Sequence, residues 1–136
     1  METRTSTSHP LYLDTLDLPG GGRLGLTLCP GKKDPLGMSG VWDRDLGADL
    51  AAIAAWGARA LVTLMEAREL AALQVPHLGR RAEALGIRWH HLPIPDGGVP
   101  DGAFEAAWAE TGPVLHRRLA AGEGVVLHCR GGLGRT

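Results

Sequence analysis

Residues 125–136, VVLHCRGGLGRT, carry the strongest structural signal in this 136-residue chain. The first four form a short apolar run, which is typical of a buried strand in a parallel sheet. Cys129 and Arg135 follow, with five residues between them, three of which are glycine. Glycines let the backbone curl so that successive N–H groups point into one concavity. The stretch therefore predicts a strand that leads into an anion-binding loop.

The residues before this stretch alternate between helical and strand patterns. Apolar residues at i, i+4 and i+7 predict a helix over 45–56, which Asp43 or Asp45 can cap and which Gly57 ends. Further helices are predicted over 66–73, 78–85 and 103–121, and further strands over 59–65 and 87–92. The expected fold is α/β, with a mainly parallel central sheet flanked by helices in one domain over residues 11–136.

Residues outside these elements are expected to be loops or edges. We expect a flexible tail over 1–10, a hairpin or two short strands over 11–18 and 23–29, and loops over 30–41 and 93–102. Lys32 and Lys33 would form a solvated pair in the first of these loops. Three tryptophans are expected in the core: Trp56, Trp89 and Trp108.

Composition excludes several classes of protein. Apolar residues make up 44%, the formal net charge is −1 and the pI is about 6.6. Such a balance provides no overall attraction to nucleic acid or to an anionic membrane. Two cysteines do not make a disulfide framework, and the N-terminus has no apolar signal segment. We therefore expect a cytoplasmic protein without membrane insertion.

The loop after the last strand has the chemistry of a phosphate site. The guanidinium of Arg135 offers a planar fork of donors that suits two phosphate oxygens. A thiolate at Cys129 would be stabilised by the same positive field, so its pKa should fall below the ordinary value. Nucleophile, cradle and clamp would then lie within seven residues.

Residues 128–136, HCRGGLGRT, resemble the signature of the protein tyrosine phosphatase superfamily. Residues 90–101, HHLPIPDGGVPD, are similar to the acid-loop segment of the cyclin-dependent kinase-associated (inhibitor 3-like) phosphatases in the dual-specificity branch. The segment LCPGKK, residues 28–33, resembles the N-terminal pattern of the same group. The resemblance covers residues 25–136 and implies a phosphatase-like fold that is truncated after the phosphate loop, with its C-terminal helices missing.

This resemblance implies metal-independent hydrolysis of phosphomonoesters through a phosphocysteine on Cys129. The substrate would be protein phosphotyrosine, with phosphoserine and phosphothreonine as further possibilities, or a small phosphomonoester. Asp96 would be the general acid, Thr136 would donate a hydrogen bond to the departing sulfur, and His128 would orient the loop from behind. The phosphate would be held by Arg130, Gly131, Gly132, Leu133, Gly134 and Arg135. No cofactor is implied.

Several alternatives remain open at this level. Asp101 is the second candidate acid, although it is also placed to cap the next helix. The chain could instead be a phospho-ligand-binding module with little turnover, or a phosphoinositide phosphatase. His90 and His91 do not make a metal site, because adjacent strand residues face opposite sides of a sheet. Cys29 is either a redox partner of Cys129 or a buried structural thiol.

Overall fold

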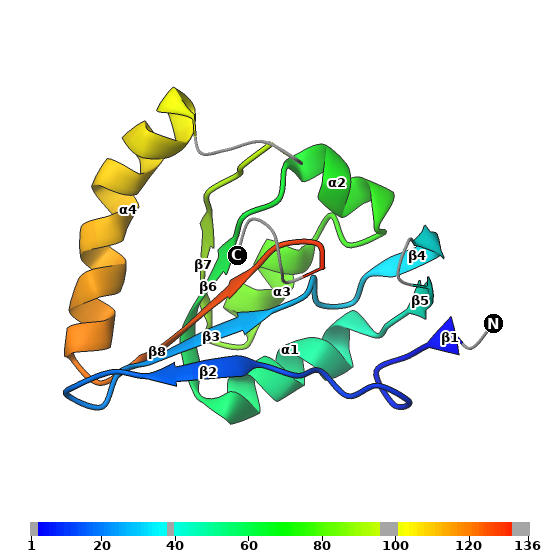
Figure 1. Ribbon diagram of the computed structural model, residues 1–136, viewed down its shortest axis with the longest axis horizontal. Helices are drawn as coiled ribbons and strands as arrows, with labels where there is room; N and C mark the ends of the chain where they lie inside the picture. The colour runs from blue at the N-terminus through cyan, green and yellow to red at the C-terminus, as the bar shows by residue number, and fades with distance from the viewer. Residues whose placement is uncertain (1–2, 38–39, 96–100, 132–136) are drawn as a thin grey trace.

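The computed structural model describes residues 3–37, 40–95 and 101–131, and its centre is a five-stranded sheet. Its strands lie in the order β2-β3-β8-β6-β7 (Figure 1). They are β2 (Asp14–Asp17), β3 (Arg23–Thr27), β8 (Gly124–His128), β6 (Ala58–Thr63) and β7 (Arg88–His91). The pairs β3–β8, β8–β6 and β6–β7 are parallel, and β2–β3 is an antiparallel hairpin. The predicted α/β class and the hairpin are both confirmed.

Four helices cover the two faces of this sheet among the described residues. They are α1 (Leu46–Trp56), α2 (Ala67–Ala72), α3 (Leu78–Ala84) and α4 (Gly102–Ala120). One apolar cluster joins α1, α2 and α3 to one face, where Leu61 and Val126 point. A second cluster joins α4 to the opposite face, where Val62 and Val125 point. Neighbouring residues of each strand thus enter different clusters, as the two-residue repeat of a strand requires.

The ends of the helices follow the capping rules. Asp45, and not Asp43, caps α1, and its side chain accepts a hydrogen bond from the Ala48 N–H at 2.9 Å. Gly57 ends that helix in the left-handed conformation, with φ of 106°. Pro113 lies inside α4, which continues through it as the single helix expected from the sequence.

The expectation of a loop over residues 30–41 was wrong, because most of this segment is strand. β4 (Lys33–Gly37) and β5 (Gly40–Asp43) pair antiparallel, and β1 (Thr3–Arg4) adds to β5 in parallel. Prolines and glycines suggested a loop, but Pro35 lies on β4, which is an edge strand of this small sheet. Thr3 and Arg4, in the segment expected to be a flexible tail, pair with Val41 and Trp42 of β5.

Two expectations about side-chain exposure were also wrong. Trp108 is 45% exposed on α4 and stacks on Phe104 instead of entering the core. Lys32, expected in solvent, is only 3% exposed.

In the described part of the chain, no helix has both the length and the apolar character needed to cross a membrane.

Candidate active site

Cys129 lies at the carboxyl end of β8, between β3 and β6. At the preceding residue, His128, β8 is in register with Thr27 of β3 and Thr63 of β6. The carboxyl ends of parallel strands are where open α/β sheets bind ligands. Cys129 is 3% exposed and packs in the cluster under α4. The sheet thus holds this thiol at the edge from which the predicted phosphate loop begins.

A chain of polar contacts fixes the residue before the cysteine. The Nδ1 atom of His128 lies 3.1 Å from the Cys129 carbonyl oxygen, and its Nε2 atom lies 2.8 Å from the Thr63 hydroxyl. A carbonyl only accepts, so Nδ1 carries the proton and Nε2 accepts from Thr63. The Thr63 hydroxyl in turn accepts from the indole N–H of Trp89 at 2.7 Å. His128 is fully buried, so this chain orients the backbone of the nucleophile from behind.

Lys32 contacts the start of the loop from the other side. Its ammonium donates a hydrogen bond to the Arg130 carbonyl at 3.3 Å and lies 4.0 Å from the centre of the Trp42 ring. The Arg130 carbonyl also accepts from the Cys29 N–H at 3.2 Å. Burial lowers the pKa of Lys32, because a low-dielectric site disfavours the charged form. Nothing local in the Lys32–Lys33 pair signals this burial.

The side chain of Arg130 turns outward and binds Asp34 of β4 at 2.9 Å. Beside it lies an open cleft of about 300 Å³, lined by Arg68, Glu69 and Ala72 of α2 together with Arg130. The cleft therefore lies next to the residue that follows the nucleophile. The two arginines that line the cleft come from different parts of the fold, Arg68 from α2 and Arg130 from the segment after β8.

Cys29 is a buried thiol on the other side of the sheet. It belongs to the cluster under α1, α2 and α3, whereas Cys129 belongs to the cluster under α4. The two thiols thus pack into different apolar clusters. Burial raises the pKa of Cys29 from 9.0 to about 12. This environment matches the structural reading of Cys29 and disfavours the redox reading.

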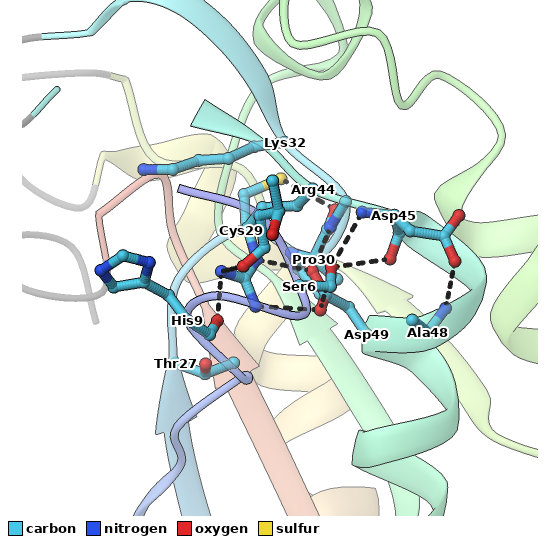
Figure 2. Close-up of polar contacts among 12 residues, drawn as sticks. Ser6, His9, Thr27, Cys29, Pro30, Lys32, Arg44, Asp45, Ala48 and Asp49 are labelled. Atoms are coloured by element: carbon cyan, nitrogen blue, oxygen red, sulfur yellow. Dashed lines mark hydrogen bonds and ion pairs between the residues drawn. The ribbon is translucent and has the colours of Figure 1, made fainter. Parts of the chain in front are cut away.

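A buried ion pair holds the segment that carries Cys29 and Lys32 (Figure 2). Arg44 and Asp49 pair through two contacts of 2.8 and 3.0 Å, and each side chain is 1% exposed. Asp49 also accepts from the Gly31 N–H at 2.8 Å and from the Ser6 hydroxyl at 2.9 Å. The other end of Arg44 donates to the His9 carbonyl at 2.7 Å. One pair thus joins the N-terminal segment, α1 and the loop before β4.

The remaining predicted site residues divide into two groups. Asp101 caps α4, because its carboxylate accepts from the Phe104 N–H at 2.9 Å. Its predicted capping role is therefore confirmed. The other predicted residues lie outside the described part of the chain: Asp96, Gly132, Leu133, Gly134, Arg135 and Thr136.

A thiol at the carboxyl end of a central parallel strand, in a sequence that continues with glycines, is the arrangement expected of a phosphatase that uses a cysteine. Residues 36–136 match the family described as polymorphic toxin system, DSP-PTPase phosphatase, and the chain belongs to this family of dual-specificity phosphatases.

Known relatives agree with this assignment. Cyclin-dependent kinase inhibitor 3 of Mus musculus is 33% identical over 93 residues, which are 68% of this chain and 43% of the mouse protein. The protein of the same name from Rattus norvegicus is 41% identical over 68 residues, 50% of this chain and 31% of the rat protein. The chain thus spans less than half the length of these curated relatives.

Solved structures share the fold. Kinase-associated phosphatase, with serine in place of its catalytic-site cysteine, superposes with a TM-score of 0.79 at 29% identity. The match covers 93% of this chain and 68% of that one. The active form of Tk-PTP gives a TM-score of 0.58 at 26% identity, over 82% of this chain and 60% of that one. The predicted resemblance to the kinase-associated phosphatases is confirmed.

Proposed function

We propose that this chain hydrolyses phosphomonoesters of phosphorylated protein, above all phosphotyrosine, through a phosphocysteine on Cys129. One observation carries the proposal. Cys129 lies at the carboxyl end of the central parallel strand, where the sequence continues with the Cys-x5-Arg spacing of a phosphate cradle. A thiolate nucleophile also requires a reducing compartment, so a cytoplasmic location is part of the proposal.

The proposed reaction has two displacements. The Cys129 thiolate attacks phosphorus, a P–S bond forms, and the P–O bond to the tyrosine breaks. The leaving oxygen takes a proton from Asp96 as it departs. Water then attacks the phosphocysteine and gives its proton to the Asp96 carboxylate. The P–S bond breaks to release inorganic phosphate and the thiolate, with Thr136 donating to the sulfur.

The phosphoryl group needs donors for its equatorial oxygens throughout this reaction. We assign them to Arg135 and to the backbone N–H groups of residues 130–135. Asp96 is preferred as the acid over Asp101. The Asp101 carboxylate already accepts a hydrogen bond at the start of α4, which supports a structural role for it.

The test is the hydrolysis of a generic aryl phosphate in the presence of EDTA by the wild type and by Cys129→Ser. We expect metal-independent turnover by the wild type and none by the variant. Binding of inorganic phosphate should persist in Cys129→Ser, because the cradle remains. Retained turnover in the variant would refute the nucleophile.

Two other results would point to a different function. Phosphate binding by the wild type without turnover of any ester would identify a phospho-ligand-binding module. Hydrolysis of phosphoinositides, with phosphotyrosyl peptides left untouched, would identify a lipid phosphatase.

A further inference from the structure

The geometry points to Lys32 as a positioning residue of the phosphate loop, whose contact with the Arg130 carbonyl aims the following N–H into the cradle. This inference rests on the proposed function, because it concerns how the same cradle is built. Lys32 belongs neither to the Cys-x5-Arg motif nor to the acid loop. It approaches the site from the segment before β4.

The argument starts from the peptide unit between Arg130 and Gly131. None of the described peptide bonds is cis, so this carbonyl and the Gly131 N–H point in opposite directions across one plane. The carbonyl is held by two donors on one side, the Cys29 N–H at 3.2 Å and the Lys32 ammonium at 3.3 Å. The Gly131 N–H is consequently turned to the side away from Lys32. A cradle for an oxyanion requires N–H groups that point inward in this way.

Burial makes this contact unusual for a lysine. Lysines are almost never fully buried unless they are paired, yet Lys32 is only 3% exposed. Its ammonium lies over the Trp42 ring at 4.0 Å, and the other face-on cation at this ring is Arg4, 5.1 Å from the centre. Such a site fixes the direction of the ammonium, because the ring face and the carbonyl oxygen are both rigidly held and both attract its positive charge.

The charge of Lys32 acts alongside the hydrogen bond. The charged and titratable groups that influence its pKa are Cys29, Asp34, Arg130 and Arg44. Burial is the largest influence and lowers the pKa of Lys32. An anion bound in the cradle would favour the charged ammonium, so phosphate binding and protonation of Lys32 should strengthen each other.

The chain supplies a matched control. Its only two lysines are Lys32 and Lys33, which are adjacent in sequence. The Lys33 side chain is 41% exposed and pairs with Asp43, its register partner on the neighbouring strand β5. Lys32→Met retains an unbranched apolar side chain for the Trp42 ring but removes the donor and the charge. Lys33→Met removes the same groups from the neighbouring position.

The first experiment compares these variants in two assays that do not need turnover. One is the binding of inorganic phosphate, and the other is the pH dependence of alkylation by iodoacetate. We assign the alkylation to Cys129, because the pKa of Cys29, which burial raises to about 12, keeps that thiol protonated. We expect Lys32→Met to bind phosphate roughly tenfold more weakly, as for a lost hydrogen bond to a charged group. Its alkylation profile should move to higher pH, and Lys33→Met should match the wild type.

Lys32→Arg should recover part of the phosphate affinity and part of the wild-type alkylation profile, because it keeps the charge and the donors. A folded Lys32→Met with unchanged phosphate binding and an unchanged alkylation profile would overturn the inference. Equal losses in Lys32→Met and Lys33→Met would also overturn it, because only one of the two side chains reaches the Arg130 carbonyl.

The second experiment uses the wild type and does not depend on the stability of any variant. With ¹⁵N-labelled lysine, the two ammonium groups are followed by NMR as phosphate is added. The pKa of Lys32 should rise with phosphate while that of Lys33 stays constant. No response of Lys32 at saturating phosphate would refute its role. A third result would separate the two proposals. If Lys32→Met weakens phosphate binding and shifts the alkylation profile while the wild type hydrolyses no ester, the role of Lys32 is supported and only the proposed function is refuted.

Discussion

Replacing Asp49 by asparagine tests how strongly the buried ion pair stabilises the fold. The Asp49 carboxylate accepts four hydrogen bonds, two from Arg44 and one each from Gly31 and Ser6. Asparagine has nearly the same volume, but one of its two polar atoms becomes a donor that faces other donors. The variant also leaves the Arg44 charge buried without a counter-charge. Removing one partner of such a pair costs about 3–5 kcal/mol, which we expect as the loss in free energy of unfolding.

The assay is urea unfolding followed by tryptophan fluorescence, with the urea dependence m checked for constancy. Asp43→Asn is the matched control, because Asp43 pairs with Lys33 at a site where the two side chains are 59% and 41% exposed. An exposed pair is worth about 1 kcal/mol or less. The double variant Arg44→Met/Asp49→Leu should be more stable than Asp49→Asn, since no uncompensated charge remains. Equal losses in Asp49→Asn and Asp43→Asn would refute the reasoning.

Three further predictions concern the acid, the packing and the second thiol. Asp96→Asn should slow hydrolysis of phenyl phosphate far more than that of esters with very acidic leaving groups, and an equal loss on both would move the acid role elsewhere. Gly79→Ala should cost about 1–3 kcal/mol, because its Cβ would lie 2.3 Å from a ring carbon of Trp89. Gly102→Ala, where a Cβ meets nothing within 4 Å, should be nearly neutral by urea unfolding, and similar losses would contradict the clash. The pKa of Cys29 is raised from 9.0 to about 12, so the folded protein holds a proton that the unfolded chain releases between these values. Stability should therefore fall as pH rises from 9 towards 12, and less steeply in Cys29→Val; identical slopes would contradict the burial of the thiol.

The large elements could be predicted from the sequence because their signals are local. Apolar spacing located α1 and β6 to within a residue or two, and Asp45 with Gly57 marked the ends of the helix. Such signals depend on residues a few positions apart along the chain. The position of Cys129 at the end of a central strand also followed from its own neighbours.

The small sheet and the burial of Lys32 could not be predicted in the same way. β4 contains a proline and ends near glycines, and it forms a strand only because β5 supplies its partner. Lys32 meets the ring of Trp42 and the carbonyl of Arg130, which is 98 residues away in the chain. No periodicity within residues 30–41 reports on contacts at such separations. These contacts depend on the parallel pairing of β3 with β8, which brings the two loops together.

The three most deeply buried charged side chains of the described chain are connected, directly or through one another's contacts, to the loop that follows β8. Arg44, Asp49 and Lys32 are each 3% exposed or less, and well-packed apolar residues would serve stability at least as well as a buried pair. Apolar contacts are non-directional, however, and cannot set the plane of a peptide unit. The Asp49 carboxylate accepts a hydrogen bond from the Gly31 N–H. The next residue is Lys32, whose ammonium donates a hydrogen bond to the Arg130 carbonyl. We infer that these buried charges give the proposed phosphate loop a fixed direction in addition to supporting the fold.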